Sequence, residues 1–130
     1  MKSIHALSNA LEIFRQIYPD IPATTIMVFL QVVIRPGISS RDTAEAIGSS
    51  QSAISRHFSM LGEYTWRGEE GWGLVDLIEE PTNRRMKVAF LTSKGQALAE
   101  KIAVAIDPTG RSLPPAETAD AYVRRVRGQI

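Results

Sequence analysis

The sequence predicts a single, mainly α-helical domain that carries a small antiparallel β-hairpin, an α+β fold. Apolar residues recur at helical spacing over most of the 130 residues. Two short runs rich in branched and apolar residues, 74–79 and 86–92, interrupt that pattern and predict a pair of strands. The composition, 44% hydrophobic and 22% charged, is close to the globular average and argues against disorder and fibrous repeats.

Two helices are predicted at the start of the chain. Residues 3–18 have apolar side chains every three or four positions, and Pro19 and Pro22 end this helix. A second helix, capped by Thr24 or Thr25, runs to residue 34. It is apolar on more than one face, which is typical of a helix at the centre of a domain.

Two short helices follow, separated by a tight turn. Ser39 or Ser40 caps the first, and Gly48 stands where a chain leaving a helix adopts a left-handed conformation. Ser49 or Ser50 caps the second helix, which begins almost at once. Such close spacing predicts a helix-turn-helix.

The second of these short helices has distinct apolar and polar faces. Ile54, Phe58 and Leu61 recur at i, i+4 and i+7 and predict a buried stripe. His57 is expected to pack on the flank of this stripe without a chemical role. The opposite, solvent-facing side carries Gln51, Ser52, Ser55, Arg56 and Ser59.

The segment between this helix and the strands is rich in glycine. We interpret residues 63–73, with three glycines, as a loop, and a small hairpin turning at residues 68–71 is the alternative. Trp66 and Trp72 are expected to pack this segment onto the domain. The strands at 74–79 and 86–92 then flank a connection at residues 80–85, which gives their hairpin a basic tip.

The last predicted helix of the domain spans residues 93–106. Thr92 caps it, and residues 107–110, which include Pro108, close it. We therefore assign residues 1–110 to the domain and residues 111–130 to a C-terminal extension. The extension is either a short helix at residues 116–127 or a loose tail.

This order of elements predicts a winged helix-turn-helix, in which the strand hairpin is the wing. The second short helix has about the width of a DNA major groove, and its free N-terminal N–H groups can meet a phosphate. Its small polar side chains allow close approach to base edges. A cationic wing tip suits the negative potential of a narrow minor groove.

Two segments also resemble the multiple-antibiotic-resistance regulators (MarR family) of bacterial transcription factors. Residues 40–61, SRDTAEAIGSSQSAISRHFSML, are similar to the helix-turn-helix of that family, and PTNRR (81–85) with VAFLTSKG (88–95) is similar to its wing. The resemblance implies a homodimer paired through the first and last helices, with a recognition helix in each of two successive major grooves. It also implies that Arg85 enters the minor groove, although Asn83 stands where the family usually has Asp.

The predicted site residues form three groups. For the recognition helix they are Ser49, Ser50, Gln51, Ser52, Ser55 and Arg56, supported by Ser40 and Arg41. For the wing they are Asn83, Arg84, Arg85 and Lys87. Dimerisation is assigned to Ile4, Leu7, Leu11, Phe14, Leu98, Ile102 and Ile106.

The charge distribution fits a partner as anionic as DNA better than the net charge of +1 does. Residues 81–95 carry four basic and no acidic residues, whereas residues 62–80 carry six acidic and one basic. We therefore predict a dimeric, sequence-specific transcriptional regulator that binds double-stranded DNA and acts as a repressor, with any small-molecule effector left open. The alternatives are a winged-helix protein-interaction module and an initiator or partition-type DNA-binding protein of a plasmid or phage.

Other classes of function find no support in the sequence. There is no cysteine, no histidine close to a Ser/Asp pair and no glycine-rich phosphate loop after a strand, so we expect no enzyme. Only His5 and His57 could supply nitrogen ligands, so we expect neither a metal nor a cofactor. No apolar run is long enough to span a bilayer and no secretory signal is evident, which indicates a cytoplasmic protein.

Overall fold

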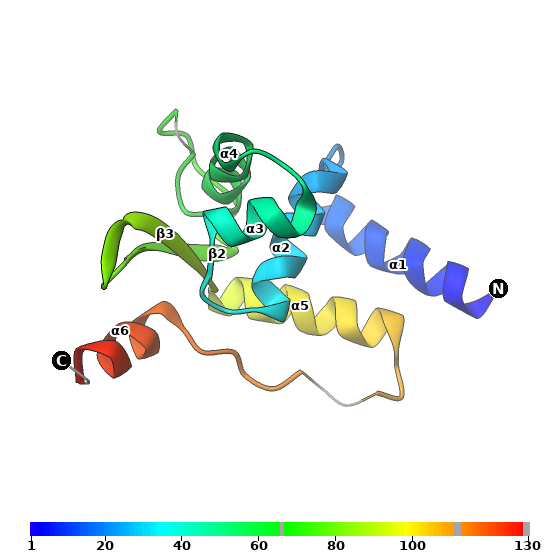
Figure 1. Ribbon diagram of the computed structural model, residues 1–130. Helices are drawn as coiled ribbons and strands as arrows, with labels where there is room; N and C mark the ends of the chain where they lie inside the picture. Colours follow the sequence, from blue (N-terminus) through cyan, green and yellow to red (C-terminus); the bar gives the residue numbers. More distant parts are fainter. Residues whose placement is uncertain (66, 111–112, 129–130) are drawn as a thin grey trace.

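The computed structural model describes residues 1–65, 67–110 and 113–128, and Figure 1 shows their arrangement. In this part of the chain the predicted α+β fold is confirmed. Trp66 and residues 111–112 and 129–130 lie outside the described residues. The elements are α1 (Lys2–Ile17), α2 (Ala23–Ile34), β1 (Ile38–Ser39), α3 (Ser40–Ile47), α4 (Gln51–Leu61), β2 (Val75–Glu80), β3 (Asn83–Leu91), α5 (Ser93–Ile106) and α6 (Ala119–Gly128).

Side-chain caps begin three of the helices as the sequence predicts. The Ser39 hydroxyl accepts from Asp42 N at 3.0 Å, the Ser50 hydroxyl from Ala53 N at 3.1 Å, and the Thr92 hydroxyl from Gly95 N at 3.0 Å. Each bond satisfies one of the N–H groups that the first turn of a helix leaves free. These caps fix the starts of α3, α4 and α5.

The predicted cap of α2 was wrong. The helix begins at Ala23 after Pro22, whose φ of −66° leads into it, and no side chain caps it. Thr25 therefore lies inside the first turn, where its side chain is fully buried. At the end of α3, by contrast, Gly48 has the left-handed conformation expected of it, with φ of 77°.

The strands form a three-stranded antiparallel sheet in the order β1-β3-β2. The two-residue strand β1 was not predicted. The strand predicted at residues 86–92 corresponds to β3, and its predicted start was wrong. Strand β3 begins at Asn83, so that only residues 81–82 separate it from β2. The wing, which is β2, β3 and this turn, is therefore longer and its turn is tighter than the sequence pattern indicates.

Residues 63–65 and 67–73 form no strand, as the loop interpretation predicts, but they fold back on themselves as in the hairpin alternative, and this segment is here called the short hairpin. An isolated bridge joins Tyr64 to Glu70, and Thr65 N donates to Glu69 O at 2.7 Å. One further bond closes this short hairpin, and another attaches it to the end of α4. Gly71 N donates to Glu63 O at 2.7 Å, and Trp72 N to Met60 O at 3.0 Å.

The core lies on one face of the sheet, and α6 covers the other face (Figure 1). On the inner face, Val75, Ala89 and Leu91 join the apolar side chains of α1 to α5. On the outer face, Val88 and Phe90 pack against Ala119 of α6. Residues 119–128 of the C-terminal extension therefore form a docked helix rather than a loose tail.

Candidate nucleic-acid interface

Helix α4 presents a polar face to solvent because its apolar stripe is buried. Ile54, Phe58 and Leu61 are at most 2% exposed. Burying side chains of this size stabilises the fold by roughly 1.5–3 kcal/mol each, so the orientation of the helix is firmly set. Four of the five residues that the sequence assigns to the opposite face are exposed in the structure: Gln51, Ser52, Ser55 and Arg56. Ser59 is half-buried, and its hydroxyl donates to Tyr64 O at 3.3 Å.

The residues around the starts of α3 and α4 differ in their exposure to solvent. Ser50 is exposed, but its hydroxyl already accepts from Ala53 N and lies 3.2 Å from the Ser52 hydroxyl. Ser49 is half-buried in the turn between α3 and α4. Ser40 is half-buried and Arg41 exposed in the first turn of α3. The first turns of α3 and α4 thus bring the predicted supporting and recognition residues to the surface.

The wing residues lie on an irregular part of β3. Pairing follows one register from Val75 to Glu79 and then shifts, so that Glu80 pairs with Asn83. This shift leaves residues 84–86 without a partner on β2, and such a bulge changes the directions of its side chains. The Asn83 side-chain oxygen accepts from Arg85 N at 3.3 Å and helps to hold the bulge. Asn83, Arg84, Arg85 and Lys87 are all exposed.

The basic side chains of this surface are uncommitted within the described residues. Arg41, Arg56, Arg84, Arg85 and Lys87 form no ion pair or side-chain hydrogen bond with any described residue. Arg35, by comparison, is paired with Asp42 at 3.1 Å. The uncommitted cations can meet an anionic partner without breaking internal contacts.

His57 fastens the inner flank of α4 to α2. Its Nδ1 lies 2.9 Å from the hydroxyl oxygen of Thr25. Burial lowers the pKa of the imidazole from its ordinary value of 6.5, because the charged form loses hydration. A neutral imidazole bonded to a buried hydroxyl is a structural group, which agrees with the flank position expected from the sequence.

A groove beside α4 was missed by the sequence reasoning. It has a volume of about 420 Å³ between α4 and the short hairpin and is lined by Ala53, Arg56, His57, Met60, Thr65, Arg67 and Glu69. The signal that could have indicated it is the direct connection of residues 63–73 to α4. Trp72 packs against the main core, as expected, and so holds the short hairpin against the domain. The centre of its ring lies 5.6 Å from the centre of the Tyr18 ring.

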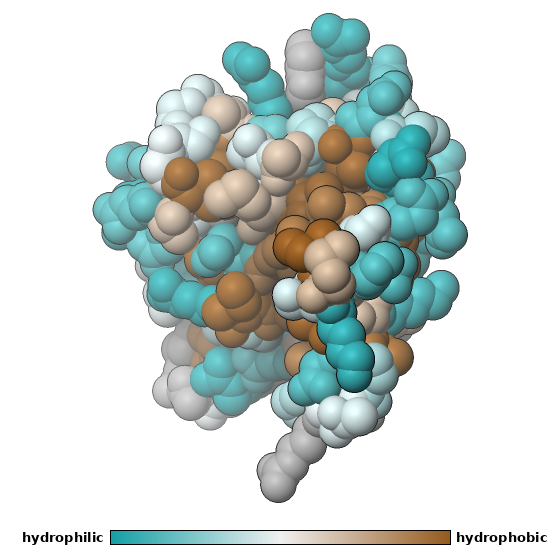
Figure 2. Space-filling view, turned by 90° about the vertical axis from the view of Figure 1, so that its right-hand side faces the viewer, coloured by the Kyte–Doolittle hydropathy of each residue, from teal (hydrophilic) through white to brown (hydrophobic). Residues whose placement is uncertain are grey.

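The residues assigned to dimerisation divide into two sets. Phe14, Leu98 and Ile102 are 3%, 5% and 9% exposed and belong to the core of the chain itself. The others remain on the surface: Ile4 is 60% exposed, Leu7 52%, Leu11 42% and Ile106 49%. Helices α1 and α5 run side by side (Figure 1), and Figure 2 shows apolar side chains gathered on the end of the molecule where α1 begins.

The described part of the chain has neither a metal-binding cluster nor a membrane-spanning helix. No group of three or more His, Asp or Glu side chains there is arranged to hold a metal ion. None of its helices is long and apolar enough to cross a lipid bilayer.

Comparison with solved structures identifies the class of fold. The transcriptional regulator Tm0710 from Thermotoga maritima matches 99% of this chain and 72% of its own at a TM-score of 0.62 and 12% identity. A MarR-family transcriptional regulator from Rhodococcus sp. RHA1 matches 95% of this chain and 80% of its own, with a TM-score of 0.56 and 21% identity. The reduced form of AbfR bound to DNA matches 95% and 84%, with a TM-score of 0.55 and 17% identity.

The fold is therefore the winged helix of MarR-type regulators. No protein-family model matches the sequence, and no curated protein matches it significantly. The likeness consequently lies in the course of the chain, and the function must be argued from the surface that this fold presents.

Proposed function

We propose that the protein is a dimeric, sequence-specific DNA-binding regulator of transcription that represses by occupying promoter DNA. The observation that carries the proposal is the pairing of an exposed polar face on α4 with uncommitted cations on the wing. The shared fold adds support, since AbfR has this fold and is described as bound to DNA.

The recognition helix supplies the groups that read bases in the major groove. The amide of Gln51 can bond in bidentate fashion to adenine, and the guanidinium of Arg56 to guanine or a phosphate. Ser52 and Ser55 are small and let the helix backbone approach the base edges. Base contacts of this kind carry specificity, whereas phosphate contacts fix position.

The wing supplies charge at the neighbouring groove. Arg84 and Arg85 stand together in the bulge of β3, with Lys87 beyond it. Guanidinium groups favour a narrow minor groove, where the negative potential is strongest. We assign Arg85 to this groove and the other two cations to phosphates.

A dimer places two copies of this surface on one face of DNA. The exposed apolar residues of α1 and α5 supply the dimer contact, because burying them removes apolar surface from water. A two-fold dimer would set its recognition helices about one helical turn apart, roughly 34–36 Å. The expected operator is therefore an inverted repeat.

The first experiment selects bound sequences from a random duplex pool and measures affinity for the selected site by fluorescence anisotropy. We expect Arg85→Ala to weaken binding to all duplexes and to reduce the salt dependence by about 0.9 for each phosphate that the variant no longer neutralises. Gln51→Ala should instead relax the preference at one base, at a cost of about 1–3 kcal/mol. Lys101→Ala, on the exposed face of α5, is the control and should change neither.

Equal affinity of the wild-type protein for selected and random duplexes would overturn the proposal. A protein-interaction module is then the second candidate, since Tyr64 is 62% exposed on the short hairpin among acidic neighbours. Its sign would be a stoichiometric protein complex that Tyr64→Ala abolishes.

A further inference from the structure

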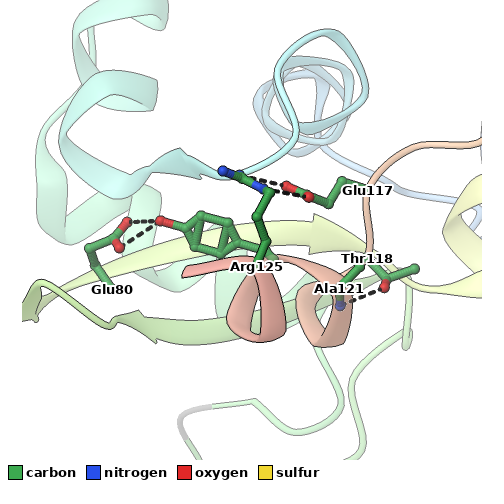
Figure 3. Close-up of polar contacts among 6 residues, drawn as sticks. Glu80, Glu117, Thr118, Ala121 and Arg125 are labelled. Atoms are coloured by element: carbon green, nitrogen blue, oxygen red, sulfur yellow. Dashed lines mark hydrogen bonds and ion pairs between the residues drawn. The ribbon is translucent and has the colours of Figure 1, made fainter. Parts of the chain in front are cut away.

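Helix α6 is docked on the wing by a continuous set of contacts. The Tyr122 ring lies 5.0 Å from the Phe90 ring at an angle of 37°, and Ala119 is 6% exposed between α6 and the sheet. The Tyr122 hydroxyl donates to the carboxylate of Glu80, at 2.6 Å and 2.7 Å from its two oxygens (Figure 3). Because Glu80 pairs with Asn83 at the wing turn, this bond ties α6 to the base of the turn.

The contacts of Tyr122 keep it in the donating form. Burial and the nearby Glu80 carboxylate raise the pKa of the phenol to about 12. The Arg125 guanidinium lies 5.3 Å from the centre of the same ring and is bound by both oxygens of Glu117, at 3.0 Å and 3.1 Å (Figure 3). Arg125 and Glu80 are therefore engaged within the chain, and the Glu80 carboxylate is held against α6.

Two other arginines of α6 remain uncommitted. Arg124 and Arg127 are exposed and form no ion pair or side-chain hydrogen bond with the described residues. They are three residues apart, so they share one side of the helix. Asp120 lies on this side but one turn earlier, at the end of α6 that approaches Asp76.

Acidic and basic residues therefore lie at opposite ends of α6, with Asp120 in its first turn and Arg127 in its last. The acidic end faces acidic neighbours, since the carboxyl of Asp76 has its pKa raised by burial, by Asp120 and by Glu63. The basic end lies at the same end of the molecule as the wing tip (Figure 1). The uncommitted arginines of α6 are therefore carried by a helix that packs on the two strands of the wing and ends on the same side of the molecule as the wing tip (Figure 1).

We infer that α6 is a further DNA contact, in which Arg124 and Arg127 bind backbone phosphates just outside the groove that receives the wing. The inference rests on the proposed function, since it extends the same DNA-binding surface. Phosphates are the partner that the chemistry favours, because guanidinium groups bond well to phosphate oxygens and neutralise the charge of the duplex. Contacts of this kind add affinity and footprint without reading sequence.

The test compares wild type with the double variant Arg124→Ala, Arg127→Ala. Both bind the selected site in a duplex that extends about one turn, roughly 10 base pairs, beyond it. The slope of log affinity against log salt concentration should fall by about 0.9 for each phosphate that is no longer neutralised. Hydroxyl-radical footprinting should show protection reduced only on the flanks, with the central site unchanged.

Two controls separate charge from structure. Arg124→Lys, Arg127→Lys keeps both charges and should restore most of the slope, whereas a purely structural role would not follow the charge. Lys101→Ala removes an exposed cation from α5 and should leave the slope and the flanking footprint unaltered.

The outcomes distinguish this inference from the proposed function. An alanine double variant that binds with the wild-type slope and footprint overturns the role of α6 and leaves the proposed function standing. The role of α6 is also overturned if the variant binds more weakly but keeps the wild-type slope, because α6 would then only brace the wing. Failure of the wild-type protein to bind any duplex overturns both.

Discussion

His57 joins α4 to α2 through a hydrogen bond to the buried side chain of Thr25. Its lowered pKa has a defined consequence for stability. The unfolded chain binds a proton near the ordinary value of 6.5, while the folded chain binds it only at lower pH. The contribution of His57 is therefore complete above that value and decreases as the pH falls through it.

We expect urea-unfolding experiments between about pH 8 and about pH 5 to show this loss. The free energy of unfolding of the wild-type protein should decrease more steeply below its plateau than that of His57→Gln, which keeps a polar side chain but does not titrate. Parallel curves for the two proteins would contradict the assignment of a neutral, bonded imidazole.

At the scale of single elements, α4 depends on its N-terminal cap. The Ser50 hydroxyl satisfies Ala53 N, so Ser50→Ala should lower the free energy of unfolding by about 1 kcal/mol. Ser55→Ala lies on the exposed middle of the same helix and should be neutral or slightly stabilising, because alanine favours helix. Thermal and chemical unfolding of the two variants measure the difference, and an equal effect of both would contradict the role of the cap.

The helices could be predicted from the sequence because their signals are local. Apolar periodicity and the capping residues Ser39, Ser50 and Thr92 gave the positions of α3, α4 and α5 closely. The start of α2 was predicted wrongly because Pro22 precedes the helix without any side-chain cap, whereas Thr24 and Thr25 are residue types that commonly cap helices. Local sequence patterns therefore predicted where the helices lie more accurately than the residues at which they begin.

The strands were less predictable because pairing determines where they begin and end. Strand β1 has two residues and exists only through its bonds to β3, and Asn83 joins β3 because Glu80 lies opposite it. The groove beside α4 and the docking of α6 likewise depend on contacts between distant segments. The exposed face of α4 was accessible to sequence reasoning since Ile54, Phe58 and Leu61 fix it from the opposite side.

At the scale of the whole molecule, the exposed apolar residues of α1 and α5 are the surface that we propose for the dimer contact. A patch of this kind is costly to expose in a monomer, and Leu7 is 52% exposed within it. We expect Leu7→Glu to dissociate the proposed dimer in analytical ultracentrifugation, because an apolar contact would then have to bury a charged carboxylate in each copy. Affinity for the full operator should fall to that of one half-site.

Ile34→Glu provides a matched control for this prediction. It introduces the same charge at an apolar residue that is 73% exposed at the end of α2. The control should leave the sedimentation and the DNA affinity unchanged. A wild-type protein that sediments as a monomer while bound to its operator would contradict the assignment of this face.

The short hairpin is held against the end of α4 by the bond from Trp72 N to Met60 O at 3.0 Å. A side chain at Gly71 would press its first carbon into the backbone oxygen of Gly62, which leaves no space for sliding. Since the protein has no cysteine, Tyr64→Cys would create a unique attachment point for a fluorophore on this exposed hairpin. Such a dye would lie beside α4, so its emission should change in real time if this helix enters a nucleic-acid groove as we propose.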